Sequence, residues 1–428
     1  MTRNRRGLTA PGYIVAAVLV VTVFAAATLP AARAGARDLA DRYSGGAATD
    51  LIDRIDNKFD FPWESPNVQW QVSNAAAQSL DEAKIDALQA DLAGRGTKAL
   101  LIVRNGKIVR EWYAPESGVN RKLTIAGATK GVVAAIALQL AINDGLIGID
   151  DPAWHYIPQW EHDAVRSQIT IRHLMTHSSG IENVLWGRGK ELNAWEQKFS
   201  DDGEARFLMA IEEAPLGFAP GSSYNYSSVG YYALSYALAT AMLDAEDTNV
   251  QSLLNNRIME PLEIPRLAWA MSYGTLYEVN GLELNATAGG GSYTARALAK
   301  VGQLMLNEGR WNGKQLIPAE LVKEMTSYGG SPQTRVMADT EPASGLGWQT
   351  NYDGFFPSLP RDAFLTTGAN HELLLVIPSL DIVVVRQGTP LTTPSTYPTV
   401  DYWLEFDRYV FSPLMAAVSH VALSDTGN

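Results

Sequence analysis

The stretch Thr124-Ile125-Ala126-Gly127-Ala128-Thr129-Lys130-Gly131 leads into the segment that decides the fold. The residues after it are apolar at three- and four-residue steps, which predicts a helix over about 127–141 that is packed on one or more faces. Gly145 then supplies a helix stop signal. Lys130 therefore falls in the first turn of a mostly apolar helix, where loss of water disfavours the charged amine and favours a role as a base.

This stretch resembles the S-x-x-K motif of serine β-lactamases and penicillin-binding proteins. The resembling branch includes class C β-lactamases, esterases, D-aminopeptidases and 6-aminohexanoate-dimer hydrolases. In that family the serine is the nucleophile, and the lysine faces it from one helical turn later. In this chain the serine position holds Gly127, so the motif reads G-x-x-K. The chain keeps the surroundings of a nucleophile and lacks its oxygen.

Further segments resemble the same family, in the right order, from about Thr97 to Met415. The resembling segments are the hairpin 104–113, the stretches 149–152 and 169–180, the second motif 220–231, the stretch 292–316 and the third motif 366–368. In the second motif Tyr226 aligns with the tyrosine that helps the lysine to move protons. Ser228 stands where asparagine is usual, and its hydroxyl can donate to a substrate carbonyl or accept from Lys130.

The third motif, Thr366-Thr367-Gly368, occupies the place of Lys-Thr-Gly or His-x-Gly, so Thr366 replaces the family's cation. By resemblance, the backbone N–H groups of Gly127 and Ala369 would hold the oxyanion of acyl transfer. Both donors are main-chain groups. The exchange of serine for glycine therefore leaves them in place.

The resemblance implies an α+β fold of the β-lactamase/transpeptidase type. We expect an antiparallel five-stranded sheet flanked by helices, with a mostly helical lobe inserted at roughly 131–290 and the active-site cleft between them. Local patterns predict the same elements. Strands are expected at 99–103, 107–113, 373–377 and 381–385, and helices at 81–92, 231–243 and 402 to about 418.

The N-terminus has the three-part layout of a secretory signal, with arginines, an apolar run over 13–29 and an Ala-x-Ala site near residue 34. We expect residues 1–36 to be a signal peptide or an N-terminal membrane anchor, with residues 13–29 as a possible tether. The protein would then be exported to the periplasm or the cell exterior. Residues 37–78 would wrap over the domain at 79–418, leaving a tail at 419–428.

The composition limits the classes of molecule that this chain is expected to bind. The formal net charge of −12 and the pI near 5.0 argue against nucleic acid. The chain has no cysteine, which excludes disulfides and a cysteine nucleophile. We expect no cofactor. The expected ligand is a small amide, ester or peptide.

Three patterns that would suggest other chemistry are incomplete. His173 and His177 stand four residues apart, but no third metal ligand is arranged nearby. His371-Glu372 would need a second histidine at position 375 to resemble a zinc protease motif, and that residue is leucine. Gly289-Gly290-Gly291 lacks the residues of a phosphate-binding loop, so we expect a tight turn beside the cleft. No metal site is predicted.

No other residue is a convincing nucleophile. Thr124 is one turn too early, Thr129 points around the helix from Lys130, and Ser227 and Ser228 belong to the opposite wall. Tyr226 is a conceivable but weak nucleophile. Three hypotheses follow. The chain is a ligand-binding pseudoenzyme, it is a hydrolase with an unrecognised nucleophile or a water activated by Lys130 and Tyr226, or Gly127 is an altered serine in an ordinary serine hydrolase.

Overall fold

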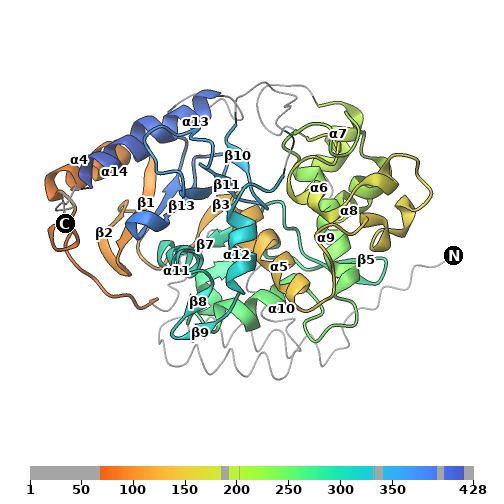
Figure 1. Cartoon of the computed structure of the whole chain (residues 1–428), viewed down its shortest axis with the longest axis horizontal. Helices are drawn as coiled ribbons and strands as arrows, with labels where there is room; N and C mark the ends of the chain where they lie inside the picture. The colour runs from red at the N-terminus through yellow and green to blue at the C-terminus, as the bar shows by residue number, and fades with distance from the viewer. Residues whose placement is uncertain are drawn as a thin grey trace, which may run out of the picture. The chain divides into compact units, whose positions relative to one another are not determined.

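In the computed structural model, residues 68–184, 192–201, 203–330, 332, 341–392 and 400–418 are described (Figure 1). All of them belong to one structural unit, residues 63–428. The expected signal or anchor at 1–36, most of the expected extension at 37–78 and the tail at 419–428 lie outside the described residues. Among the described residues, no helix is long and apolar enough to cross a membrane.

Seven strands form the main antiparallel sheet in the described part of the chain. Its long strands come from the most apolar and β-branched segments, as strand propensity requires. The order across the sheet is β10 (Ala343–Ser344), β11 (Gln349–Thr350), β12 (Phe364–Thr367), β13 (Leu373–Ile377), β14 (Ile382–Gly388), β1 (Thr97–Arg104) and β2 (Lys107–Tyr113). The β1–β2 hairpin at Asn105-Gly106 and the β13–β14 pair confirm the sequence prediction. The two-residue strands β10 and β11 extend the expected five-stranded sheet at one edge.

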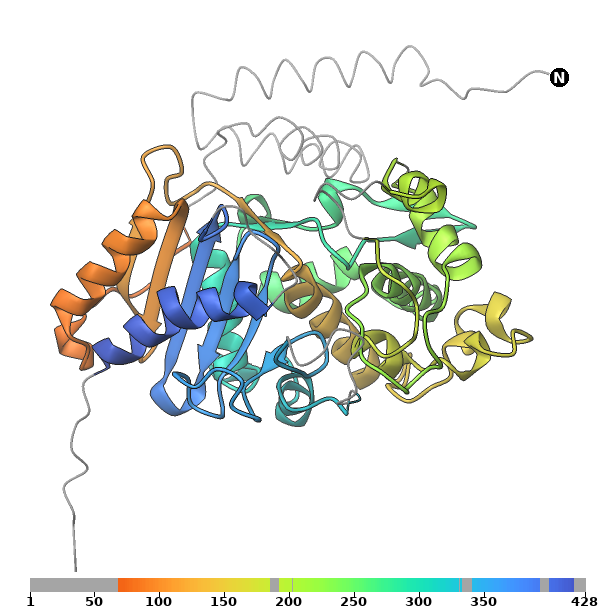
Figure 2. The ribbon, with the colours of Figure 1, turned by 90° about the horizontal axis from the view of Figure 1, so that it is seen from above.

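Helices cover both faces of this sheet. On one face, Leu100, Ile102 and Val384 pack with α4 (Glu82–Gly94), α13 (Val400–Phe406) and α14 (Ser412–Ala417). Figure 2 shows these helices together on the same side of the strands. On the other face, the alternate residues Leu101, Val103 and Val385 pack with α11 (Ala295–Leu306). This alternation follows from the two-residue period of side chains in a strand.

The helix predicted at 127–141 is present, but its first part is wound as a π-helix. Lys130–Ala135 has π-helical hydrogen bonding and α5 (Ile136–Asn143) continues it. Its residues from Ala128 to Ala141 are buried on all sides. π-helical turns occur frequently at functional sites.

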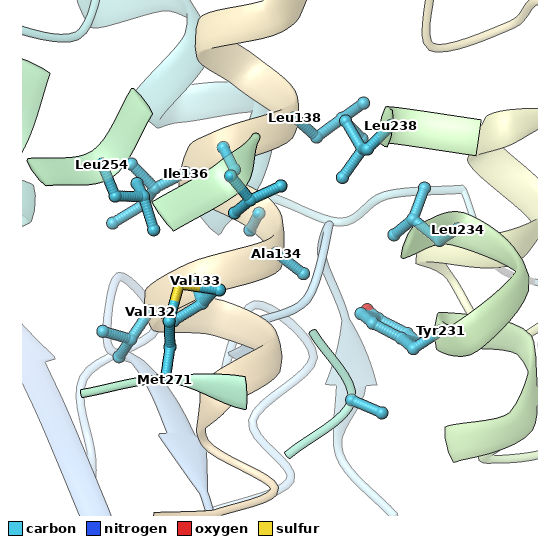
Figure 3. Close-up of a cluster of buried hydrophobic side chains, with 14 of the residues drawn as sticks. Val132, Val133, Ala134, Ile136, Leu138, Tyr231, Leu234, Leu238, Leu254 and Met271 are labelled. Carbon is cyan, nitrogen blue, oxygen red and sulfur yellow. The ribbon is translucent and has the colours of Figure 1, made fainter. Parts of the chain in front are cut away.

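Among the described residues between 131 and 290, helices make up most of the regular secondary structure. The π-helical turns Lys130–Ala135 and α5 together form what we call the central helix. It packs between α9 (Ser228–Ala241) and α10 (Val250–Leu254), with Met271 beside its first turns (Figure 3). A small sheet joins β3 (Leu123–Ala126), β7 (Gly291–Tyr293) and β4 (Trp269–Ala270) beneath the start of the helix. The remaining elements are short: α6 (Ile171–Met175), α7 (Ala194–Asp201), α8 (Ala205–Leu208), α12 (Ala319–Thr326), β5 (Tyr277–Val279), β6 (Leu282–Leu284), β8 (Arg310–Trp311) and β9 (Lys314–Gln315).

Candidate functional site

Gly127 lies at the junction between β3 and the central helix. Ala126, just before it, has a left-handed backbone with φ of 43°, a conformation that is uncommon for residues with a side chain and often marks a functional turn. The turn is closed by hydrogen bonds from Ala128 N to Ile125 O and from Lys130 N to Gly127 O. Lys130 is therefore fixed one turn beyond Gly127.

Lys130 is 3% exposed, and its ammonium has an acceptor for each of its three protons. Nζ donates to the Tyr226 hydroxyl at 2.7 Å, the Ser228 hydroxyl at 3.1 Å and the Ala288 carbonyl at 2.7 Å. No carboxylate is among these partners. A buried amine held only by neutral oxygens is suited to exchange protons with the hydroxyls beside it.

Tyr226 and Ser228 are placed by the start of α9. Ser227 is the N-cap residue and accepts from Gly230 N, while its own N–H donates to Nδ1 of His177 at 3.1 Å. The His177 ring lies 4.5 Å from the Tyr226 ring. Burial, with a smaller contribution from Lys130, lowers the pKa of His177 well below its usual value. His177 therefore supports Tyr226 and Ser227 as a neutral ring.

Two backbone N–H groups at the site have no acceptor in the described part of the chain. Among the described residues, neither the Gly127 N–H nor the Ala369 N–H donates to a protein acceptor. The two segments are adjacent, because a Cβ built on Gly127 would lie 3.1 Å from the Thr367 carbonyl and 3.8 Å from Gly368 Cα. A pair of free, neighbouring N–H donors is what an oxyanion requires.

The third motif ends β12 and turns toward β13. Thr366 is 1% exposed, and its hydroxyl faces the Ala128 carbonyl at 3.4 Å. It therefore points into the central helix and adds no positive charge to the site. Gly368 has no room for a side chain, because a Cβ there would lie 2.5 Å from both Glu372 Oε2 and the Ile125 carbonyl.

Networks behind the motif hold this turn. Arg386 places all five of its N–H donors on Thr97 Oγ1 and on the carbonyls of Asn370, His371, Arg95 and Thr389. Glu372 accepts from Asn370 N at 2.9 Å, and burial raises the pKa of Glu372. The Tyr402 hydroxyl donates to the Gly368 carbonyl at 2.7 Å. These contacts leave Ala369 with its N–H free.

A serine side chain nearly fits at position 127. A Cβ there would lie 3.0 Å from the Tyr226 hydroxyl and 3.1 Å from the Thr367 carbonyl, so both neighbours would have to move by a few tenths of an ångström. The backbone of Gly127 does not have positive φ. Glycine is therefore not required here by the backbone conformation.

The hydroxyls that we considered as substitutes have other roles. Thr129 is fully buried, donates to the Ala126 carbonyl and accepts from Gly291 N. Thr124 is exposed and accepts from Ala126 N. Ser227 caps α9, as described above. Ser228 contacts Lys130 directly, although its N–H is tied to Asn183. No group of three or more metal-ligating side chains occurs among the described residues.

Sequence reasoning did not identify three residues at this site. The Ala288 carbonyl completes the environment of Lys130, and a main-chain acceptor leaves no signal in the sequence. His177 was weighed as a metal ligand, and the resemblance implied a structural role for its segment, but its contacts with Tyr226 and Ser227 were not predicted. Tyr273 lies over the glycine run 289–291, where its hydroxyl is 3.0 Å from a Cβ built on Gly289. The glycine run was the only available signal for Tyr273.

Comparisons with known proteins agree with the fold and the motif order. An uncharacterised protein from Alkalihalophilus pseudofirmus is 25% identical over 71% of this chain and 86% of its own length. Esterase EstB from Burkholderia gladioli is 33% identical over 24% of this chain and 28% of its own. A penicillin-binding protein homologue from Caulobacter crescentus has the same fold, with a TM-score of 0.58, 16% identity and coverage of 81% of this chain and 99% of its own. The Beta-lactamase family model matches residues 83–389, and the chain therefore belongs to the β-lactamase family.

Proposed function

We propose that this chain is an exported, ligand-binding member of the β-lactamase family that cannot form an acyl-enzyme, because position 127 carries no hydroxyl. One observation carries this proposal. The pair that would transfer protons, Lys130 and Tyr226, is present, whereas the side-chain oxygen that would accept the acyl group at position 127 is absent. Lys130 and Tyr226 lie 2.7 Å apart, and the N–H groups of Gly127 and Ala369 are free within the described residues. Acyl transfer to the protein needs an attacking side-chain oxygen in addition.

The proposed ligand is a small carbonyl compound, an amide, ester or peptide, with its carbonyl oxygen on the two N–H groups. Export and a possible tether through residues 13–29 belong to the same proposal, and their support is the N-terminal sequence alone. Nucleic acid is not a proposed partner, given the net charge of −12.

The test compares the full-length protein with Lys130→Ala, with Gly127→Ser and with Gly127→Ser/Lys130→Ala. Each is treated with a fluorophosphonate probe and with 4-nitrophenyl acetate. We expect labelling and turnover only in Gly127→Ser. Loss of a serine nucleophile costs about 10⁶-fold in the serine-protease case and leaves a residual of about 10³-fold over water. The gain on restoring serine should therefore be several orders of magnitude.

Two outcomes would overturn this proposal. Turnover by the unmodified protein that disappears in Lys130→Ala would favour a water activated by Lys130 and Tyr226. Absence of any labelling in Gly127→Ser, with the fold intact by circular dichroism, would mean that the site no longer supports acyl transfer even when its oxygen is restored. The first result would make the chain an active hydrolase.

A further inference from the structure

Tyr273 is an exposed aromatic residue close to the turn that carries Gly127. It follows β4, and 49% of its surface is exposed. Its hydroxyl is 3.0 Å from the Cβ that Gly289 would carry, and the Ala126 carbonyl is 3.8 Å from the same point. Ala126 directly precedes Gly127, and Ala288, directly before Gly289, is the carbonyl partner of Lys130. The phenol thus borders the candidate site.

The backbone that carries this phenol is held in an unfavourable conformation. Ser272 and Tyr273 have φ values of 55° and 56°, so two consecutive residues with side chains are left-handed. Such a conformation persists only where neighbouring contacts impose it. Here Ser272 is fully buried, its hydroxyl donates to the Thr275 carbonyl at 2.6 Å, and it accepts from Ala286 N at 2.7 Å. Met271, just before, is buried beside Val133 in the core (Figure 3).

The glycine run makes room for the ring. A Cβ on Gly290 would lie 2.5 Å from Tyr273 N and 2.7 Å from the ring atoms Cγ and Cδ2. Tyr273 N also donates to the Gly290 carbonyl at 3.1 Å. The strained backbone and Gly290 therefore act together to lay an aromatic ring over the glycine run that follows Ala288, the carbonyl partner of Lys130, while leaving about half of the residue exposed.

We propose that Tyr273 is a specificity-determining wall of the ligand site, and that it contacts the acyl group of a neutral carbonyl ligand, favouring flat aromatic or apolar acyl groups. This inference rests on the function proposed above. The preference for a neutral ligand follows from charge. Thr366 stands where the family's cation would lie, and the three N–H groups of Lys130 are already bonded. A ligand carboxylate would thus lack a cation at either position. Arg206 also acts on the Tyr273 phenol, but it already donates to Phe199 O, Ser200 O and the Tyr232 hydroxyl.

The test measures binding of three stable amides to the full-length protein by saturation-transfer NMR and calorimetry. N-benzoylglycinamide is neutral with an aromatic acyl group, N-acetylglycinamide is neutral with a small one, and N-benzoylglycine adds a carboxylate. We expect N-benzoylglycinamide to bind best. Tyr273→Asn should weaken its binding about fivefold, as expected for loss of one aromatic contact. The same substitution should change N-acetylglycinamide binding less than twofold, and Tyr273→Phe should leave both unchanged.

Asparagine is chosen because it tolerates left-handed backbone better than other residues with side chains. Tyr273→Asn should therefore keep or raise the melting temperature while it weakens binding, which a packing role would not produce. Tyr352→Asn is the matched control, because Tyr352 is 40% exposed and stacks on Tyr328.

Three results would overturn the inference. It is wrong if Tyr273→Asn binds N-benzoylglycinamide as the native protein does, if the same variant loses several degrees of melting temperature, or if N-benzoylglycine binds best. In each case the proposed function still stands when Gly127→Ser gains fluorophosphonate labelling. If no amide binds the native protein and Gly127→Ser is also inert, the proposed function fails and the inference fails with it.

Discussion

Two hydrogen-bond networks meet at the turn that follows β12. The rear network is centred on Arg386 and the front network on Lys130, and they differ in the kind of acceptor that each cation contacts. In the rear network, Arg386 is fully buried and donates four of its five N–H groups to main-chain carbonyls. In the front network, Lys130 is almost as buried, yet two of its three acceptors are side-chain hydroxyls that can rotate. The rear network fixes backbone, whereas the front network holds groups that can exchange protons. Burial of a cation alone does not show which role it has.

The largest expected effect comes from replacing the two buried cations by an apolar side chain of similar length. Arg386→Met would leave four carbonyls and Thr97 Oγ1 without their donor and would remove the positive charge that acts on Glu372, and we expect a loss of about 3–5 kcal/mol in the free energy of unfolding. Lys130→Met should lose about 1 kcal/mol, since Tyr226 and Ser228 can turn their hydroxyls toward other acceptors. Urea unfolding of both variants measures the difference.

Arg361→Met is the control for this pair, because Arg361 is exposed and donates only to the Tyr352 carbonyl among the described residues. Equal losses for Arg386→Met and Lys130→Met would contradict the comparison. The front network would then be structural as well.

A second prediction concerns Gly131, which lies between the two networks. A Cβ there would lie 2.9 Å from both Cβ and Oγ1 of Thr366 and 3.0 Å from the Gly347 carbonyl. Overpacking of this kind costs about 1–3 kcal/mol, more than the roughly 1 kcal/mol that alanine gains over glycine inside a helix. Gly131→Ala should therefore lower the urea midpoint. An unchanged midpoint would show that β12 can move away from the central helix.

A change of pH should also affect stability in opposite directions through His177, which supports the front network, and Glu372, which lies in the rear network. The pKa of His177 is lowered in the folded state, so below about pH 6.5 the unfolded chain binds a proton that the folded chain does not. Stability should then fall with decreasing pH by at most about 1.4 kcal/mol per unit. Glu372 has a raised pKa, so its contribution falls as pH rises above about 4.5.

The measurement is urea unfolding of the native protein and of His177→Asn between pH 5 and 8. Asparagine keeps an acceptor for Ser227 N and does not titrate, so the difference between the two curves isolates His177. The native curve should fall more steeply below pH 6.5. Parallel curves would mean that His177 takes up a proton in the folded state.

Much of the front network could be predicted from sequence, because its side chains lie in spaced motifs. Lys130, Tyr226 and Ser228 were expected together, and the structure brings them together. The rear network was missed because its partners are main-chain carbonyls from segments far apart in the sequence. Arg386 lies within an apolar strand, where no motif marks it. Tyr273 was missed for a related reason, since left-handed backbone at a residue with a side chain has no sequence signature.

The smallest expected effect decides what Gly127 itself means. Gly127 and Gly131 lie one turn apart, but the close neighbour of Gly127 is the end of Tyr226, which can shift, as well as the Thr367 carbonyl at 3.1 Å. Gly127→Ala should therefore change the free energy of unfolding by about 0.5 kcal/mol or less, because the reduced freedom of the unfolded chain offsets the tight contact. Urea unfolding beside Gly131→Ala measures both. A small change would mean that the fold tolerates a side chain at position 127. The absence of serine would then affect the reaction at the site and not the stability of the fold. A loss as large as that of Gly131→Ala would mean that the front network packs too closely against Gly127 to accept a side chain. Restoring serine would then disturb the Lys130–Tyr226 contact.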